Sequence, residues 1–301
     1  MAMDKSNKRE EFDVNQGHGD HNDCLFSPDA DMENGVAGWL PKTSRASKVI
    51  AITERPIDCS CGKEAPDMMP IAYVAIEGSP VRLMLVIGIL EKGKVSTLVS
   101  AYPECEGEEV KVRLTEIHEW ANGVEATLEG TVLGEVARDV AFFDTRYALH
   151  KGQYEIGGEY TFKMAALAYD VEIMPENERI IKIEGARAAE IRKVMGMEPE
   201  FEADGSVKPL EADQSTGVAY WSRTAKYPDD AYFQSPVFTP VGVVQAFDGE
   251  FLKMGIGIAR DDGGSDAEVR IPLYAHVKRI KQKPSEGDPV RGYIWLQGYR
   301  I

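Results

Sequence analysis

The sequence predicts an all-β protein made of two barrel-like modules of antiparallel strands, connected through one helix. Two observations support this fold class. Short runs of apolar and β-branched residues recur between Gly, Pro, Asn-Gly and Asp-Gly turns, whereas a single segment has helical periodicity. Hydrophobic residues make up 43 % of the 301 residues, which is enough for a packed core and too many for a wholly disordered chain.

The N-terminal part begins with residues 1–40, which mix Asn, Gly, Asp and Ser with few aromatic residues and predict an irregular acidic tail or arm. An N-terminal β module is expected over residues 41–196. Its longest apolar run, residues 83–90, is far below the ~20 residues of a membrane helix, so we expect a buried strand and no membrane contact. The first predicted strands are residues 48–54, 71–77, 81–90 and 95–102.

The middle of the chain contains a predicted hairpin in which Asn122-Gly123 joins two strands, because Asn-Gly favours the tight turn of a hairpin. The helix is expected over residues 186–195, where Ala188, Ile191, Val194 and Met195 share one face and Gly196 ends it. The strands expected here are residues 110–120, 124–133, 140–143, 160–173 and 179–183.

The C-terminal part is predicted to follow an acidic linker at residues 197–215, which is rich in Glu, Asp, Pro and Gly. A second β-barrel-like module is expected over residues 216–301. Its predicted strands are residues 217–221, 237–247, 251–259, 267–274 and 290–299.

The order of elements in residues 110–173 resembles an OB-fold barrel. A long strand, a tight turn, two further strands ending in Phe142-Phe143, a connector and a strand starting Gly-Glu-Tyr-Thr-Phe carry this resemblance, so that residues 109–185 form an OB-like part. Residues 237–301 show a similar order of elements, but match it less well. The resemblance implies a barrel that binds single-stranded nucleic acid, oligosaccharides or partner proteins on one sheet face.

Charge is distributed unevenly along the chain. The formal net charge is −16, which argues against coating DNA or an anionic membrane through bulk charge. Residues 1–40 hold 9 acidic and 3 basic residues, whereas residues 236–301 hold 8 acidic and 9 basic residues. No secretory signal is recognisable and four cysteines do not make a disulfide scaffold, so a reducing, cytoplasmic setting is predicted.

The N-terminal region carries residue types that bind zinc. Imidazole and thiolate are preferred zinc ligands, and four of the five candidates would complete a tetrahedron. The paired Cys-x-x-Cys spacing of strong zinc signatures is absent, so a polar arm with reduced thiols and a redox-active pair stay as alternatives. The candidates are His18, His21, Cys24, Cys59 and Cys61.

A histidine with neighbouring carboxylates is the only sign of acid–base chemistry. His118 is expected to share one face of an alternating strand with Glu116, opposite Ile117, and His150 has Asp144 nearby. Such pairs arise freely in strands, and the pattern is typical of a solvated face. No catalytic residue is therefore assigned.

The last strand carries the most informative pattern. Alternation places Gly292, Ile294, Leu296 and Gly298 on one face, and the opposite face is expected to gather aromatic, amide and guanidinium groups. This face can stack bases, anchor a protein partner or pack within the chain. Its residues are Arg291, Tyr293, Trp295, Gln297 and Tyr299, preceded by a basic loop with Lys278, Arg279 and Lys281.

We therefore predict a non-catalytic binding or assembly protein that uses this aromatic face to engage a partner protein or a second copy of itself. Trp295 and Tyr293 would bury ring area against the partner, and Arg291 with the basic loop would orient an acidic group. Single-stranded nucleic-acid binding through the same face is the alternative. A zinc-dependent enzyme is the third hypothesis.

Overall fold

The computed structural model describes residues 24–25, 47–58, 68–76, 80–90, 94–120, 122–194, 196–222, 229–246, 249–260 and 267–301. Strands dominate these residues, which confirms the predicted all-β class. None of the helices in this part of the chain has the length and apolarity needed to cross a membrane.

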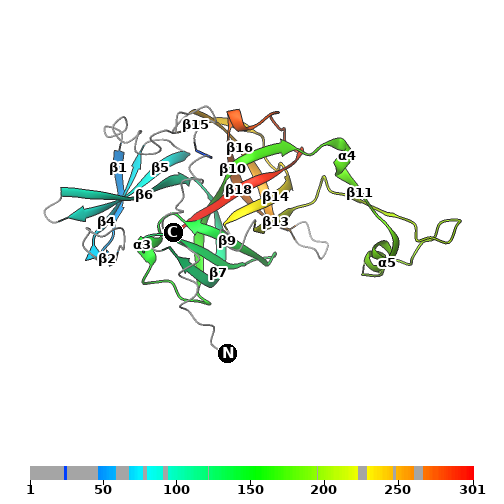
Figure 1. Ribbon diagram of the computed structural model, residues 1–301, viewed down its shortest axis with the longest axis horizontal. Coiled ribbons are helices and arrows are strands. Elements are labelled where there is room, and N and C mark those ends of the chain that lie inside the picture. Colours follow the sequence, from blue (N-terminus) through cyan, green and yellow to red (C-terminus); the bar gives the residue numbers. More distant parts are fainter. Residues whose placement is uncertain are drawn as a thin grey trace.

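A closed barrel of five strands lies at the centre of the molecule (Figure 1). Its strand order, β7-β8-β9-β18-β10 and back to β7, is consistent with an OB-like fold. All neighbours are antiparallel except β9 and β18, which pair in parallel. The strands are β7 (Glu108–Glu119), β8 (Ala126–Val132), β9 (Arg138–Asp144), β10 (Glu159–Ile173) and β18 (Pro289–Arg300), with helix α3 (Tyr147–His150) between β9 and β10.

The fifth barrel strand comes from the far end of the chain, so the two predicted modules share strands. Strand β18 pairs with β10 from Phe162 opposite Arg300 to Ile173 opposite Val290. Strand β18, at the end of residues 237–301, therefore completes the barrel formed by the middle of the chain. One buried apolar cluster runs through both halves.

Five further strands extend the sheet on both sides of the barrel. Strands β13 and β14 add to β18, and β17, β16 and β15 add to β10, with β10 and β17 parallel. The sequence did not predict β14, because its residues, Asp-Ala-Tyr-Phe-Gln-Ser-Pro, form a short run with polar residues and a terminal proline. The strands are β13 (Ala219–Ser222), β14 (Asp230–Pro236), β15 (Gly242–Ala246), β16 (Gly249–Arg260) and β17 (Glu268–His276).

A separate N-terminal sheet packs against the outside of the barrel (Figure 1). Its inner strands are continuous apolar runs, and all six residues of β4 are buried. Tyr73 and Tyr102 of this sheet share one buried cluster with Phe143 of β9 and Trp295 of β18. The sheet order is β1 (Ser47–Ile52), β4 (Ile71–Ile76), β5 (Val81–Leu90) and β6 (Lys94–Cys105); β2 (Ile57–Asp58) pairs separately with β3 (Met68–Met69).

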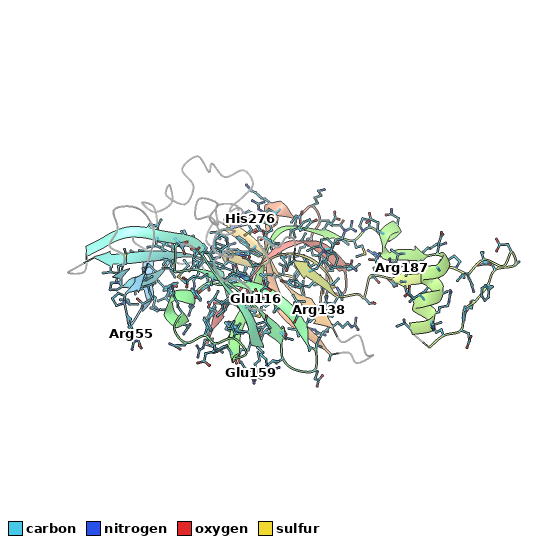
Figure 2. The ribbon with its side chains drawn as sticks, turned by 60° about the horizontal axis from the view of Figure 1, so that its bottom comes forward. Arg55, Glu116, Arg138, Glu159, Arg187 and His276 are labelled. Carbon is cyan, nitrogen blue, oxygen red and sulfur yellow. The ribbon has the colours of Figure 1, made fainter. Side chains whose placement is uncertain are left out.

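An arm between β10 and β13 projects away from the barrel, and Figure 2 shows Arg187 on its helix far from Glu116 and His276. The predicted helix face is partly wrong: Ala188 is buried, but Val194 is 83 % exposed. Arg192 is buried instead, and its guanidinium donates to the carbonyls of Lys208 and Pro209. The arm contains α4 (Glu176–Arg179), β11 (Ile180–Ile183), α5 (Gly185–Val194) and β12 (Leu210–Asp213); β11 and β12 pair, so the predicted linker 197–215 is part of this arm.

Candidate functional site

Three aromatic side chains form a row across the outer surface of β13, β14 and β18. Trp221 is paired in register with Tyr232, and Tyr232 with Tyr293. The rings of Trp221 and Tyr232 stack with centroids 4.5 Å apart, and Tyr232 meets Tyr293 edge to face at 5.6 Å. Trp221 is 51 % exposed and Tyr293 39 %, so the two ends of the row are open to solvent.

The row follows from the two-residue period of the strands. Tyr220, Phe233 and Ile294 point into the barrel core and are buried, so the residues next to them point outward. Because the outward residues are direct cross-strand neighbours, their rings come into contact. We call Trp221, Tyr232 and Tyr293 the aromatic row.

A cavity of about 220 Å³ opens beside the aromatic row. The 3-10 helix η4 (Val277–Arg279) and the residues after it supply its cationic wall. The lining therefore combines two phenol rings, three cationic groups and two carboxylates. The lining residues are Asp170, Val171, Glu172, Tyr232, Arg279, Lys281, Arg291, Gly292 and Tyr293.

Arg291 is held by two carboxylates from neighbouring elements. Its Nε donates to Oε1 of Glu172 at 2.8 Å, and its Nη1 donates to Oε2 of Glu178 at 2.7 Å. The hydrogen bonds to Glu178 and Glu172 raise the pKa of the guanidinium. Its charge is thus compensated within the protein, and the arm that carries Glu178 is tied to the cavity.

The backbone beneath the cavity is shaped by an irregularity in the pairing of β10 with β18. The register shifts between Ala168 and Asp170, and the Asp170 carboxylate accepts a hydrogen bond of 2.8 Å from the backbone N–H of Tyr293. A Cβ at Gly292 would lie 2.2 Å from the carbonyl oxygen of Asp170, so only glycine permits this approach. These contacts fix where the Tyr293 ring leaves the strand.

The structure brings together part of the predicted site. Arg279, Lys281, Arg291 and Tyr293 line the same cavity, and Lys278 is exposed on η4. The sequence missed Trp221 and Tyr232. Alternation within residues 219–222 marks Trp221 as outward, but nothing local shows that β13 and β14 lie beside β18.

Three residues of the predicted aromatic face do not belong to an exposed site. Trp295 and Gln297 are buried, because the N-terminal sheet covers this half of β18. Gln297 accepts from the backbone N–H of Cys105 at 2.8 Å and donates to the carbonyl of Pro103 at 3.1 Å. Tyr299 is half-buried, with the guanidinium of Arg146 3.9 Å from its ring centroid.

Of the predicted zinc ligands, Cys24 is buried within the cluster between the N-terminal sheet and the barrel. His18, His21, Cys59 and Cys61 lie outside the described residues. Within the residues described, one group of side chains has the composition and spacing to hold a metal ion, and it consists of Glu116, His118 and Glu129.

Comparison with known proteins identifies no relative of this chain: no family model, no curated protein and no solved structure matches it.

Proposed function

We propose that the protein is a non-catalytic binding or assembly protein that engages a partner protein through the aromatic row. The carrying observation is the in-register contact of Trp221, Tyr232 and Tyr293 on one outer sheet surface. Tyr, Trp and Arg dominate the residues that supply most binding energy in protein interfaces. In this proposal Tyr293 keeps the anchoring role that the sequence assigned to it, and Trp221 replaces Trp295 as the second anchor.

The cavity beside the aromatic row suits a partner that presents a polar or acidic side chain next to an apolar one. Lys281 is exposed at its edge, and Arg279 lines its wall. The carboxylates of Asp170 and Glu172 in the same lining accept hydrogen bonds from Tyr293 N–H and from Arg291. A mixed set of charges of this kind selects a particular orientation of the partner.

Single-stranded nucleic acid fits this surface less well. Successive bases need separate aromatic faces, but one face of Tyr232 is already covered by Trp221. Phosphate binding needs uncompensated cations, and Arg291 is neutralised by Glu172 and Glu178. The three cationic groups in the lining are the observation that keeps this function as the second candidate.

The test compares the full-length wild type with the double variant Trp221→Ala, Tyr293→Ala. Proteins cross-linked to each are identified, and the affinity of each recovered partner is then measured with purified components, a second copy of the chain included. We expect an affinity loss of about 1,000-fold, because two interface anchors of ~2 kcal/mol each are removed. Both side chains are at the surface, so the free energy of unfolding should change little.

Ile156→Ala is the matched control, because Ile156 is 61 % exposed and lies in the segment between α3 and β10. This variant should retain partner binding. A partner that binds the double variant and the wild type equally contradicts the proposal. Binding of a single-stranded oligonucleotide that weakens with salt and requires Trp221 would instead support the second candidate.

A further inference from the structure

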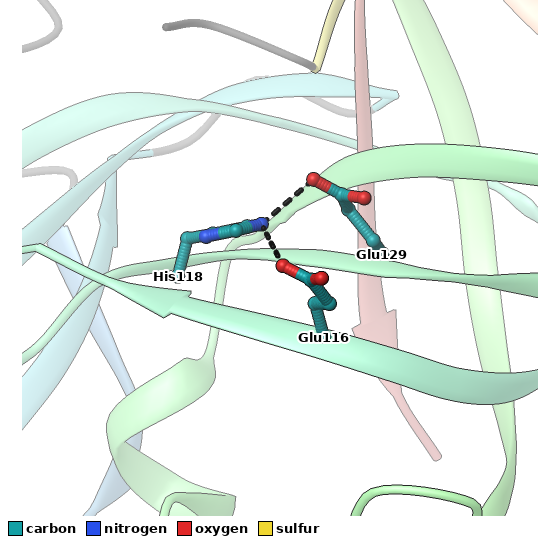
Figure 3. Close-up of side chains that lie close together, drawn as sticks. All are labelled: Glu116, His118 and Glu129. Carbon is teal, nitrogen blue, oxygen red and sulfur yellow. Dashed lines mark hydrogen bonds and ion pairs between the residues drawn. The ribbon is translucent and has the colours of Figure 1, made fainter. Parts of the chain in front are cut away.

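We propose that Glu116, His118 and Glu129 form a zinc-binding site on the outer face of β7 and β8 (Figure 3). Nε2 of His118 lies 2.7 Å from Oε1 of Glu129 and 3.4 Å from Oε2 of Glu116. The three ligand atoms all lie within 4.8 Å of one another. This site is separate from the aromatic row and from the N-terminal His and Cys residues.

A β-bulge directs two of these side chains outward. Before it, Val110, Val112 and Leu114 of β7 point into the barrel; the register then shifts between Leu114 and Glu116, and Ile117 packs against the core instead. Glu116 and His118 consequently share the outer face. Bulges commonly re-aim side chains in this way beside functional sites.

The strand register places Glu116 directly opposite Glu129, with His118 next to both. Two carboxylates in this position repel each other, and like charges directly opposite destabilise a strand pair. A divalent cation bound between them would compensate both carboxylate charges, and Nε2 of His118 lies close enough to both to act as a third ligand.

The distances suit zinc. With bonds of about 2.0–2.2 Å to nitrogen and oxygen, ligand atoms around tetrahedral zinc are about 3.3 Å apart. The separation of His118 from Glu116 is already close to this value, and the hydrogen bond between His118 and Glu129 would open slightly when the ion enters.

The histidine of the site is nearly buried, whereas the two carboxylates are accessible to solvent. The His118 side chain is only 10 % exposed, whereas those of Glu116 and Glu129 are 45 % and 36 % exposed. Solvent can therefore reach the carboxylate side and supply the fourth ligand. Glu119, the next acidic residue of β7, is engaged elsewhere, since it accepts from Tyr147 at 2.9 Å and pairs with Lys151 at 2.8 Å.

The test titrates the full-length, chelator-treated protein with Zn²⁺ against a chromophoric zinc indicator. We expect saturable binding that is lost in His118→Ala and weakened at least tenfold in Glu116→Gln and in Glu129→Gln. The two glutamine variants keep the shape of the side chains, so the test holds even where His118→Ala folds poorly. Circular dichroism establishes that each variant is folded.

Two controls locate the ion. Glu159→Gln removes an exposed carboxylate on β10, the strand that neighbours β7. The Glu159 carboxylate pairs with Lys111 and Arg113, so this variant should leave zinc binding unchanged. The combined variant His18→Ala, His21→Ala, Cys59→Ser, Cys61→Ser should also bind normally at this site. Absence of saturable binding, or binding that is unaffected by all three variants of the cluster, overturns the proposal.

Discussion

The indole Nε1 of Trp295 donates a hydrogen bond of 2.7 Å to Oδ2 of Asp229, and neither side chain is exposed to solvent. Asp229 also accepts from the hydroxyl of Thr127, and its backbone carbonyl accepts from Leu296 N–H. Trp295 is thus a structural residue that joins β18 to β8 and to the start of β14, which explains why it is not available to a partner.

Replacing Trp295 by Phe should lower the free energy of unfolding by ~2–3 kcal/mol, because a buried hydrogen bond to a carboxylate is lost. Denaturant unfolding measures this change. Partner binding by the folded variant should match the wild type, and Trp221→Phe is the exposed control with little effect on stability. Loss of binding without loss of stability would show that Trp295 contacts the partner.

Glu104 is a buried carboxylate between two arginines. It accepts hydrogen bonds from Arg82 at 3.0 Å, from Arg146 at 2.8 and 2.9 Å, and from the Thr145 hydroxyl at 2.7 Å. Burial opposes ionisation, but the hydrogen bonds and charges of Arg146 and Arg82 outweigh it and lower the pKa of Glu104. The stability that the ionised Glu104 contributes is therefore fully present at neutral pH. It is lost as the pH falls below the ordinary pKa of a glutamate and through the lowered pKa of Glu104.

Glu104→Gln should destabilise the fold by ~3–5 kcal/mol at pH 7, because the arginines lose the buried charge that compensates them. Chemical denaturation of the variant measures this. Glu109→Gln is the control, since Glu109 forms an exposed ion pair with Lys163 at 3.1 Å and should cost less than ~1 kcal/mol. Equal effects of the two substitutions would contradict the buried network.

Asp144 should make the protein less stable as the pH rises. Burial raises the pKa of this carboxyl from 3.8 to about 6, although Tyr154 and the backbone N–H of Arg146 donate to it. The folded state therefore binds a proton more tightly than the unfolded chain, and this stabilisation is full below pH ~4 and lost as the pH passes ~6. The difference between the two pKa values corresponds to ~3 kcal/mol.

The matching substitution is Asp144→Asn, which cannot titrate. The difference in the free energy of unfolding between this variant and the wild type should shift by ~2–3 kcal/mol in favour of the variant between pH 4 and pH 7.5. Denaturant titrations at a series of pH values measure it. Two parallel stability profiles would refute the raised pKa.

Gly292→Ala should disturb the cavity and the fold together. The added methyl group would meet the backbone of Asp170, so β10 and β18 must separate locally, at a cost of ~1–3 kcal/mol. The hydrogen bond from Tyr293 N–H to Asp170 should weaken, and partner binding should fall with it. Gly152→Ala is the control, because a Cβ there has open space around it.

Much of the secondary structure could be predicted, because strand patterns are local. The hairpin at Asn122-Gly123 is confirmed: Gly123 has φ 67°, and Asn122 accepts from Val124 N–H at 3.1 Å. The inward residues Ile294 and Leu296 are buried as alternation predicts. Strand β14 was not predicted, because its seven residues lack a clear strand pattern and form a strand only by pairing with β13 and β18.

The zinc-site residues show the same limit more sharply. Alternation correctly placed Glu116 and His118 on one face of the strand, opposite Ile117. From this pattern alone we expected only a solvated surface and no site. Glu129 joins them only through the register of β7 with β8, which depends on the bulge after Leu114. A single residue of register moves a side chain to the other face, so this group was not predictable from spacing.

The sequence by itself determined the all-β class, the places of most strands, and which side of β18 faces the barrel core. Only the tertiary structure decided which outward residues reach solvent. Tyr293 and Trp295 lie on the same side of β18, yet Tyr293 ends the aromatic row while Trp295 is covered by the N-terminal sheet. Alternation is set by the local backbone, whereas coverage depends on packing between segments that are distant in the chain.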